Sequence, residues 1–334
     1  MVNESNRFSE TSKDGSIEAQ IVDLIRRHGS FLVCSHKNPD GDAVGSSVAI
    51  ALFLIGEGKE VFVHNQSPIS EMYRSFYGVE LIQQQIPRDK TFEVSFLLDC
   101  GTPSRVGEVF EAFPGKGEVV AIDHHPAVEP LRGVHLIRSE ASATGEILYE
   151  ILRAYGAHLT PEIATALYMA VMTDTGSFRF SNTTANCLSI AAELMEAGAD
   201  HRLLIDQLYE NYPPKRFLLL GRVLRSLSFL FDGKVATLQV PRELYEQADE
   251  NEDLTEGFVN IPRSIRGVEV AMLFKELAPG EYRVSLRSRG KVDVGALASK
   301  LKGGGHHNAA GCTLYGNEEN VYQIMIRAVG EAIS

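Results

Sequence analysis

Short apolar runs alternate with segments of helical periodicity through the first half of the chain. Four runs of about five residues are rich in Val, Phe, Ile and Leu and predict buried β-strands. These runs are 31–34, 61–64, 94–98 and 119–122. Apolar residues recur at helical spacing over 43–55, 144–152 and 161–171. This alternation predicts an α/β domain with a doubly wound, mainly parallel sheet.

The pattern changes after about residue 186, where a mostly helical stretch leads into a second set of strands. The segments KVATLQV, VEVAMLFKEL and YRVSLRSR predict strands, and the turn sequence APGE between the last two predicts a β-hairpin. A smaller α/β domain with a mixed sheet should therefore follow the first domain. We expect a tail over 1–16, a first domain over 17–205, a helical linker over 206–230 and a second domain over 231–334.

Composition and charge narrow the classes of protein. No apolar run reaches the roughly 18 residues of a membrane helix, and the polar first 16 residues lack the apolar stretch of a signal peptide, so we expect a cytoplasmic protein. The net charge of −12 argues against a broad basic surface for long nucleic acid, but it allows a short nucleotide. Four cysteines without a CxxC pair predict buried free thiols in a reducing compartment.

Acidic residues and histidines follow the ends of the predicted strands and of one helix. These residues are His36, Asp40, Asp42, Asp99, Asp123, His124, His125 and Asp174. In open parallel sheets ligands bind outside the carboxyl ends of the strands, so we expect these side chains to gather at one edge. Gly41 is expected to let the backbone bend so that Asp40 and Asp42 can each face a different metal ion.

Several carboxylates buried together require cations to compensate their charge. Oxygen and imidazole ligands suit Mn²⁺, Mg²⁺ or Fe²⁺ better than a structural zinc ion, and two ions sharing a carboxylate are typical of phosphoesterases. Each motif alone also has a plainer explanation, since NPDGD is typical of a turn. Their occurrence at four successive element ends is what favours a metal site.

The second domain offers a candidate anion site. Period-two alternation in YRVSLRSR places Arg283, Ser285, Arg287 and Arg289 on one strand face, which alone is typical of a solvated surface. The sequence GGGHHNAAG follows a predicted helix over 294–301 with Asp293 as its N-cap. Gly303 could serve as the helix C-cap, but three glycines also leave backbone N–H groups accessible to an anion.

Together these motifs resemble a known family. SHKNPDGDAVGS, LLDCG, IDHHP and VMTDTGSFRFS resemble, in order, the four motifs of the DHH phosphoesterase superfamily. RSRGKVDVGALASKLKGGGHHNAAG resembles its DHHA1 substrate-binding domain. The size and two-domain layout are most similar to the branch of bifunctional oligoribonucleases, or nanoRNases, that are also pAp phosphatases. The resemblance implies an active-site cleft between the two domains.

The resemblance also implies roles for individual residues. One Mn²⁺ would be held by His36, Asp40 and Asp99, and the other by Asp42, Asp99, His124 and Asp174, with Mg²⁺, Fe²⁺ or Co²⁺ as substitutes. His125 would face the scissile phosphate, and Asp123 would orient the adjacent imidazoles. Substrate would be bound by Arg287, Gly304, Gly305 and His306, while the role of His307 stays open because the family motif needs only one His directly after the glycines. Arg105 and Arg179 could reach the cleft or serve on the surface.

The activity implied is hydrolysis of short oligoribonucleotides, including pGpG and pApA, to 5′-mononucleotides, and of pAp to AMP, by water activated at two metals. Alternatives are a cyclic-di-AMP or other dinucleotide phosphodiesterase, a RecJ-like single-strand exonuclease and a family-II pyrophosphatase. A non-enzymatic alternative is a nucleotide-binding regulator with a dead metal site. The expected partners are these small substrates, without long duplex nucleic acid or a membrane, and a homodimer is compatible with the sequence.

Overall fold

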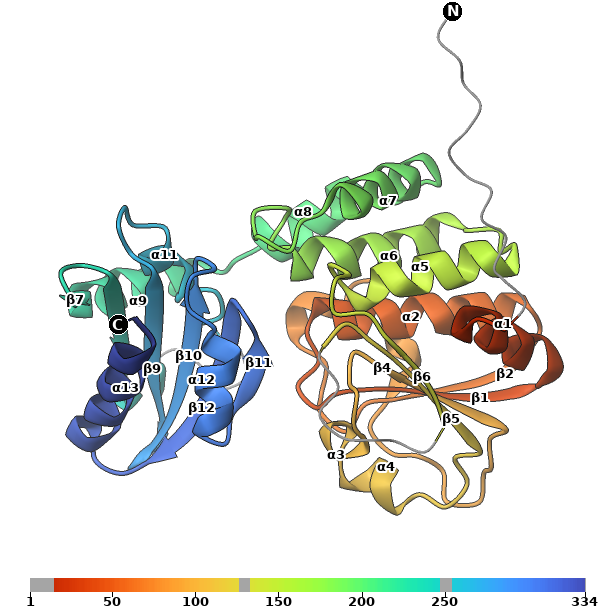
Figure 1. The fold of residues 1–334 in the computed structure, drawn as a ribbon, viewed down its shortest axis with the longest axis horizontal. Helices are drawn as coiled ribbons and strands as arrows, with labels where there is room; N and C mark the ends of the chain where they lie inside the picture. The colour runs from red at the N-terminus through yellow and green to blue at the C-terminus, as the bar shows by residue number, and fades with distance from the viewer. Residues whose placement is uncertain (1–14, 126–132, 247–253, 334) are drawn as a thin grey trace, which may run out of the picture. The chain divides into compact units, whose positions relative to one another are not determined.

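The structure is a computed structural model that describes residues 15–125, 133–246 and 254–333 (Figure 1). It divides into two compact units, Met1–Asn211 and Tyr212–Ser334, which are described here one at a time. Of the expected tail, residues 1–14 lie outside the described residues, and Ser16 is the N-cap of the first helix. Within the described ranges, every helix is too short or too polar to cross a membrane.

The first unit is built on a six-stranded parallel sheet with the order β3-β2-β1-β4-β5-β6. The strands are β1 (Ser30–Ser35), β2 (Glu60–His64), β3 (Ile82–Gln83), β4 (Val94–Leu98), β5 (Glu118–Asp123) and β6 (Val134–Ile137). The predicted parallel sheet is confirmed, and the four predicted runs are β1, β2, β4 and β5. The direction of winding reverses between β1 and β4, which is where open α/β sheets bind ligands.

Helices cover both faces of this sheet, as the alternating side chains of β1 require. Phe31 and Val33 contribute to a large core with the helices α1 (Ile17–Arg27), α2 (Gly41–Gly56), α5 (Thr144–Tyr155) and α6 (Pro161–Asp174). Leu32 and Cys34 contribute to a smaller core with α3 (Pro103–Val106) and α4 (Glu108–Ala112). The outer elements are α7 (Ala185–Glu196), α8 (His201–Tyr209), η1 (Glu71–Tyr73) and η2 (Val79–Leu81). The unit is therefore doubly wound.

Helices α2 and α6 lie in unusually close contact because α2 carries glycines at the crossing. A Cβ atom on Gly41 would lie 2.4 Å from Oγ1 of Thr173, and one on Gly45 would lie 2.4 Å from the backbone oxygen of Ala166. Gly41 is a residue of α2 itself and is not among the residues with positive φ, so the expectation that it bends the backbone is wrong. Its small size is needed for helix packing. The contact brings the first turn of α2 beside the last turn of α6.

The second unit has a mixed six-stranded sheet with the order β11-β12-β10-β9-β8-β7, as predicted. Its strands are β7 (Ser228–Leu230), β8 (Val235–Val240), β9 (Val270–Ala278), β10 (Glu281–Ser288), β11 (Gly304–His306) and β12 (Ala309–Tyr315). Only the pair β8–β9 is parallel among the described strand pairs of this sheet. The predicted hairpin is β9–β10, and Arg289 lies just beyond the end of β10.

The two faces of this sheet are covered differently. Helices α12 (Val294–Lys300) and α13 (Glu318–Ile333) pack on one face. On the other, α9 (Pro214–Val223) and the segment with α11 (Asn260–Arg263) cover β8 and β9. The remaining short elements are η3 (Leu224–Ser226) and α10 (Arg242–Glu246). Since Leu219 and Val223 of α9 are buried against β8, most of the segment 206–230 is part of the second unit.

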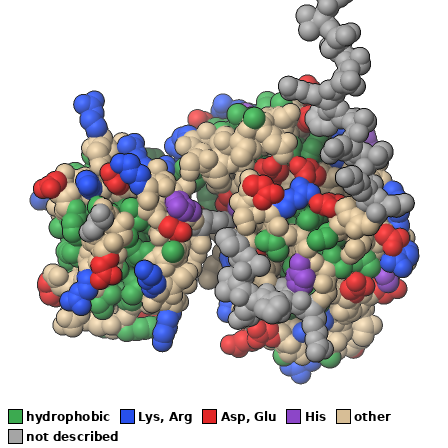
Figure 2. Space-filling view, viewed as in Figure 1, with side chains coloured by type: hydrophobic (Ala, Val, Ile, Leu, Met, Phe, Trp, Pro, Cys, Tyr) green, Lys and Arg blue, Asp and Glu red, His purple; other side chains and the backbone are tan. Residues whose placement is uncertain are grey.

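The charged side chains on the surface and the four cysteines can both be compared with the expectations from the sequence. On the face shown in Figure 2, Lys and Arg side chains of the described residues are interspersed with Asp and Glu side chains. All four cysteines are free and buried, as predicted.

Candidate functional site

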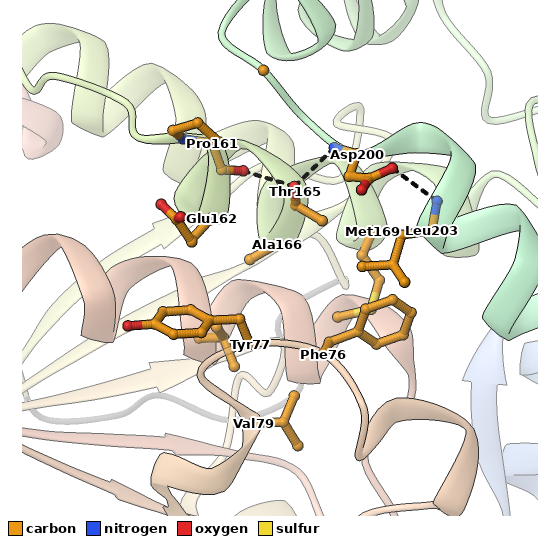
Figure 3. Close-up of a pocket in the computed structure, with 12 residues that line it drawn as sticks. Phe76, Tyr77, Val79, Pro161, Glu162, Thr165, Ala166, Met169, Asp200 and Leu203 are labelled. Atoms are coloured by element: carbon orange, nitrogen blue, oxygen red, sulfur yellow. Dashed lines mark hydrogen bonds between the residues drawn. The ribbon is translucent and has the colours of Figure 1, made fainter.

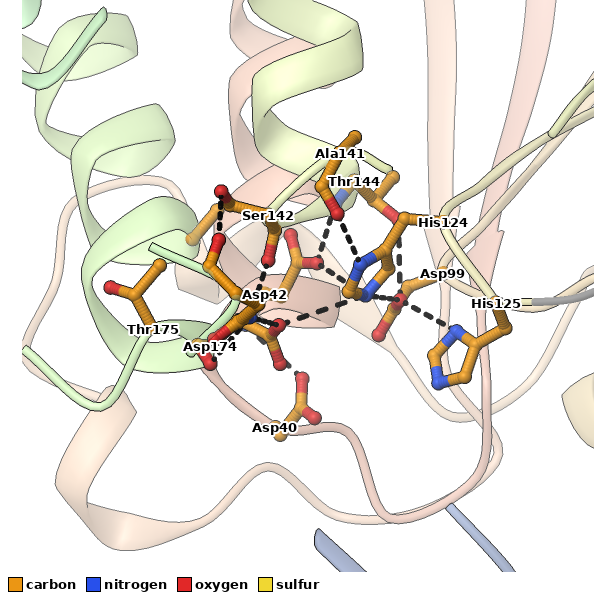
Figure 4. Close-up of polar contacts among 12 residues, drawn as sticks. Asp40, Asp42, Asp99, His124, His125, Ala141, Ser142, Thr144, Asp174 and Thr175 are labelled. Carbon is orange, nitrogen blue, oxygen red and sulfur yellow. Dashed lines mark hydrogen bonds and ion pairs between the residues drawn. The ribbon is translucent and has the colours of Figure 1, made fainter. Parts of the chain in front are cut away.

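The predicted acids and histidines of the first unit converge at the carboxyl edge of its sheet, around Asp99 (Figure 4). Oδ1 of Asp99 lies 3.5 Å from Nε2 of His124 and 3.4 Å from Nδ1 of His125. Oδ2 lies 3.3 Å from Nε2 of His36. The Asp99 side chain is 1% exposed. Three imidazoles from the ends of two strands therefore surround one buried carboxylate, which follows a third strand.

The backbone of Asp99 is itself unusual, because its φ of +56° is left-handed. Asp tolerates this region better than most residues, yet the conformation still costs energy relative to the normal region. Such conformations persist where the surrounding structure fixes them, often at functional sites. The sharp turn directly after β4 is what directs the carboxylate toward the three imidazoles.

Asp42 is held by donors from two helices. Its Oδ1 accepts hydrogen bonds from Oγ of Ser46 at 2.9 Å and from the backbone N–H of Gly145 at 3.0 Å. Its Oδ2 accepts the backbone N–H of Thr144 at 2.7 Å and lies 3.7 Å from Nε2 of His124. The N-terminus of α5 thus fixes this buried carboxylate, a role that no pattern in the sequence indicates.

Asp40 is the N-cap of α2. Its Oδ1 accepts the backbone N–H groups of Asp42 at 3.1 Å and Ala43 at 3.0 Å. The same oxygen lies 3.9 Å from Nε2 of His36, and the side chain is half-exposed. Asp40 therefore stabilises the helix that carries Asp42 while it faces the histidine of the preceding loop.

Asp174 is the last residue of α6 and completes the group. Its Oδ2 lies 3.8 Å from Nε2 of His124 and accepts a hydrogen bond from Nδ2 of Asn182 at 3.1 Å. The residues after it, Gly176, Ser177 and Phe178, all have left-handed φ values between 57° and 61°. This turn reverses the chain directly behind the carboxylate.

The two adjacent histidines are oriented by different partners. Nδ1 of His125 lies 2.7 Å from Oδ1 of Asp123, as expected for an orienting carboxylate. Nδ1 of His124 lies 3.2 Å from the backbone oxygen of Ala141 instead. A carbonyl oxygen only accepts, so this Nδ1 donates, and Nε2 of His124 faces the carboxylates. Asp123 therefore lies beside Nδ1 of His125, and the backbone oxygen of Ala141 lies beside Nδ1 of His124.

The buried carboxylates at this edge of the sheet require positive charge close to them. Burial raises the pKa of Asp174 to about 7, and burial together with the nearby Asp99 raises the pKa of Asp42 well above its usual range. Burial lowers the pKa of His124, but Asp99, Asp174 and Asp42 outweigh it and raise that pKa well above normal. Burial acts to raise the pKa of Asp99, yet the imidazoles hold it well below its ordinary value. Without other cations, the group must retain protons.

Divalent cations fit these residues. Oδ2 of Asp99 is buried and accepts no hydrogen bond from the described residues. Two sets of side chains have possible ligand atoms within 4.8 Å of one another. They are His36, Asp40 and Asp99, and Asp99, His124 and His125. The first set is one of the two predicted sets. The second shares Asp99 and His124 with the other predicted set but includes His125 in place of Asp42 and Asp174.

Two predicted arginines lie beside segments of this site. The backbone oxygen of Arg105 accepts the N–H of Lys37 at 2.8 Å, which ties α3 to the loop that carries His36. Nε of the exposed Arg179 donates to the backbone oxygen of Gly176 at 2.6 Å, in the turn after Asp174. Contact of either guanidinium with substrate remains a prediction.

In the second unit, strand register places the predicted substrate residues in neighbouring rows. Arg287 pairs with Ala309, which pairs with His306 on the edge strand. Ser285, Gly311 and Gly304 form the next row on the same face of the sheet, two residues further along each strand. Small residues therefore lie between the Arg287 position and the glycine strand. The structure describes the backbone of His306 but not its side chain.

The three consecutive glycines differ in whether the structure has room for a side chain at their positions. A Cβ atom on Gly303 would lie 2.2 Å from the oxygen of Gly311, and one on Gly305 would lie 2.4 Å from the oxygen of Ala309. A Cβ atom on Gly304 would meet nothing within 4 Å. Packing between β11 and β12 thus explains Gly303 and Gly305 but leaves Gly304 unexplained.

The structure tests the two predicted caps of α12, Gly303 and Asp293. Lys302, with a φ of +61°, takes the left-handed position after the helix, so Gly303 is not its left-handed cap. Asp293 is the N-cap, as predicted. His307 binds its own unit, with Nε2 3.0 Å from the oxygen of Gly290 and Nδ1 3.5 Å from Oδ2 of Asp293.

A cavity of about 290 Å³ lies in the first unit among residues of α2, α6 and α8 (Figure 3). Its lining is largely apolar and includes Phe76, Val79, Met169 and Leu203, together with the exposed Glu162 and Asp200. It contains none of the predicted site residues, which gather instead at the sheet edge. The cluster of acids and histidines and this cavity therefore lie at separate places in the first unit.

Comparison with known proteins gives the family. The N-terminal domain of the DHH family matches residues 30–171, and the DHHA1 domain matches residues 232–334. The chain is 34% identical to the bifunctional oligoribonuclease and PAP phosphatase NrnA of Thermus thermophilus, over 92% of this chain and 91% of that protein. It is 25% identical to the protein of the same name from Bacillus subtilis, over 91% and 95% of the two chains.

A solved structure agrees with this result. The crystal structure of an exopolyphosphatase-related protein from Bacteroides fragilis has a TM-score of 0.85 and 27% identity. The match covers 94% of this chain and 96% of that one. The chain therefore belongs to the DHH family of metal-dependent phosphoesterases and carries a C-terminal DHHA1 domain.

Proposed function

We propose that this enzyme hydrolyses short oligoribonucleotides, including linear dinucleotides, to 5′-mononucleotides and removes the 3′-phosphate of pAp, with Mn²⁺ as its metal. The observation that carries the proposal is the buried Asp99 carboxylate, which lies within 3.5 Å of three imidazoles. The relatives named as bifunctional oligoribonucleases and PAP phosphatases match more than nine-tenths of the chain, which supports these substrates.

Two Mn²⁺ ions are assigned to the sheet edge. His36, Asp40 and Asp99 would hold one, and Asp42, Asp99, His124 and Asp174 would hold the other. Mixed carboxylate and imidazole ligands suit Mn²⁺. When bound, such ions stabilise charge on phosphoryl oxygens and lower the pKa of water. The hydrogen bonds from Thr144 and Gly145 to Asp42, and from Oγ1 of Thr144 to Asp99 at 3.2 Å, support this assignment because they hold the ligands in place.

His125 is assigned to the scissile phosphate. Asp123 holds its Nδ1, so Nε2 lies on the far side of the ring from that carboxylate. Burial lowers the pKa of His125, but Asp99 and Asp123 raise it to about 9 in the metal-free protein. A protonated imidazole can donate a charge-assisted hydrogen bond to a phosphate oxygen. His125 would thereby orient the ester and stabilise its developing charge.

The second unit is assigned to one end of the substrate. The guanidinium of Arg287 can bind a phosphate in two-point fashion, and the N–H groups of Gly304 and Gly305 can approach an anion closely. The open space at Gly304 supports this assignment. His306 completes the proposed set. Binding one end of the substrate explains a preference for short chains, because only an ester at a fixed distance from that end reaches the metals.

A substrate panel with Mn²⁺ tests the proposal. RNAs of about 2 to 24 nucleotides, pAp, pGpG, cyclic-di-AMP and pyrophosphate would be compared by product analysis. We expect the fastest turnover for dinucleotides and pAp. Preference for cyclic-di-AMP, long RNA or pyrophosphate would favour one of the other phosphoesterase activities instead. Nucleotide binding without turnover would favour a regulator.

The substitution Asp99→Ala tests the metal chemistry itself. It should reduce Mn²⁺-dependent hydrolysis by about three orders of magnitude, because both ions lose a shared ligand. The circular dichroism spectrum should remain that of the wild type. The control is Asp206→Ala, which removes a carboxylate from an exposed pair with Arg202. Full activity of Asp99→Ala would contradict the proposed bridging role.

A further inference from the structure

The carboxylate of Asp174 lies where the protein backbone disfavours negative charge. Asp174 is the last residue of α6, and a helix C-terminus carries partial negative charge. Its side chain is only 12% exposed and is close to other carboxylates. A buried carboxylate in this position needs a hydrogen-bond donor to remain in one orientation.

Asn182 supplies that donor. Its Nδ2 lies 3.1 Å from Oδ2 of Asp174, 3.2 Å from the backbone oxygen of Asp174 and 3.1 Å from the backbone oxygen of Ser142. All three neighbours are acceptors, so the amide nitrogen rather than the amide oxygen must face them. The orientation of the Asn182 side chain is therefore determined by its surroundings.

Ser142 fixes Asn182 in return. Oγ of Ser142 donates to the backbone oxygen of Asn182 at 2.6 Å. The N–H of Ser142 donates to Oε2 of Glu146 at 2.9 Å, and Nδ2 of Asn186 donates to Oε1 of Glu146 at 2.7 Å. Ser142 is fully buried and Glu146 is 5% exposed. The Asn182 amide is thus one part of a partly buried network that links the chain after α6 to the start of α5.

The same start of α5 holds other members of the site. Ala141 accepts the hydrogen bond from His124, and Thr144 donates to both Asp42 and Asp99. Figure 4 shows Ala141, Ser142 and Thr144 along one side of the group. Asn182 connects Asp174 to this segment, because its Nδ2 donates to both Oδ2 of Asp174 and the backbone oxygen of Ser142.

We propose that Asn182 is a positioning residue of the metal site, which holds the Asp174 carboxylate against Ser142 so that Asp174 can serve as a ligand. This inference rests on the proposed role of Asp174 and adds a residue to it. Partners of ligating carboxylates typically change metal affinity by about 10- to 100-fold when they are removed. The loss should concern the ion bound by Asp174 and not the one bound by His36 and Asp40.

The variants Asn182→Ala and Asn182→Asp would be titrated with Mn²⁺ by calorimetry and by electron paramagnetic resonance. Asn182→Asp keeps the size of the side chain but places an oxygen opposite three acceptors. We expect one of two Mn²⁺ equivalents to bind about 10- to 100-fold more weakly in both variants. Activity should return toward the wild-type kcat at high Mn²⁺, which a merely structural defect would not allow.

Thr160→Ala is the matched control. Thr160 caps the opposite end of α6 by accepting the N–H of Ile163, so its loss should lower Tm without changing Mn²⁺ affinity. Wild-type Mn²⁺ binding in both Asn182 variants, or equal weakening in Thr160→Ala, would overturn the inference.

The variant Asp174→Ala distinguishes a failure of the inference about Asn182 from a failure of the proposed metal-ligand assignment. If this variant loses one Mn²⁺ equivalent while the Asn182 variants bind normally, only the inference about Asn182 fails. If Asp174→Ala binds both equivalents as the wild type does, the ligand assignment of the proposed function fails as well, and Asn182 has no ligand to position.

Discussion

The N–H of Asp42 donates to Oδ1 of Asp40 across 3.1 Å, so one predicted metal ligand caps the helix that carries another. The two carboxylates are therefore not independent. Removing Asp40 takes away a charge beside His36 and also leaves the first turn of α2 without its side-chain acceptor. The cap and the charge can be separated, because Asn also caps helices well but carries no charge.

Asp40→Asn should keep the thermal stability of the metal-free protein while it weakens Mn²⁺ binding. Asp40→Ala should weaken Mn²⁺ binding similarly and also lose about 0.5–2 kcal/mol of unfolding free energy, because the cap is gone. Thermal melts in EDTA and Mn²⁺ titrations measure the two effects separately. Equal melting temperatures for the two variants would argue against the capping role.

The glycines of β11 should respond differently to substitution. Gly305→Ala should destabilise the second unit by about 1–3 kcal/mol, because its φ is +138° and its Cβ would meet the backbone of β12. Gly304→Ala should melt like the wild type but raise KM for pAp, because the new methyl group enters open space assigned to the substrate. A wild-type KM in Gly304→Ala would remove the main support for phosphate binding there.

Arg287→Ala should weaken turnover of pAp and dinucleotides by about 10- to 100-fold, the size expected for one lost charged hydrogen-bonding partner. Turnover of a small chromogenic phosphodiester should change little, because it has no terminal phosphate for Arg287 to bind. Arg283→Ala is the matched control, since Arg283 is four residues earlier on the same strand and is exposed. Equal losses on both substrates would contradict the assignment.

Stability of the metal-free protein should fall as pH rises. The folded-state pKa of His125 is about 9, above its ordinary 6.5, so the stability it contributes is complete below pH 6.5 and is lost between about pH 6.5 and 9. Asp174, raised from 3.8 to about 7, acts in the same direction between about pH 4 and 7. Thermal melts in EDTA across this range measure the slope.

Mn²⁺ should reverse this dependence, because bound ions replace protons on the ligands. The increase in Tm on adding Mn²⁺ should therefore be larger at about pH 8 than at about pH 6. His125→Gln should flatten the EDTA curve above pH 6.5, whereas His158→Gln, which changes an exposed imidazole, should not. A flat curve for the wild type would contradict the raised pKa values of His125 and Asp174 from which the slope is predicted.

The sequence was informative where residue type alone determines structure. The apolar runs at β1 and β4 predicted the central strands because they are buried on both faces. At β6 the sequence VHLI is too short, and its apolar and polar residues too mixed, to predict a strand. Strand β3 has only two residues, so it also has no recognisable pattern. The acids and histidines could be placed at one edge because parallel strands end together.

The supporting contacts could not be predicted in this way. Thr144 and Gly145 hold Asp42 through backbone N–H groups, which every residue except proline possesses. Asn182 differs from any loop asparagine only by its surroundings. The contacts of His307 with Gly290 and Asp293 likewise involve a backbone oxygen and a helix cap, which the sequence does not place beside it.

The close crossing of α2 and α6 has a consequence for comparing relatives. Gly41 and Gly45 leave room for Thr173 and Ala166, and Gly145 leaves room for Ala170, whose Cβ would lie 2.5 Å from an added methyl group. In an alignment, these positions should accept larger side chains only as compensated pairs, even though none of them is an expected ligand. A homologue that retains every acid and histidine but has bulky residues on both sides of this crossing would therefore be a candidate for an inactive member of the family.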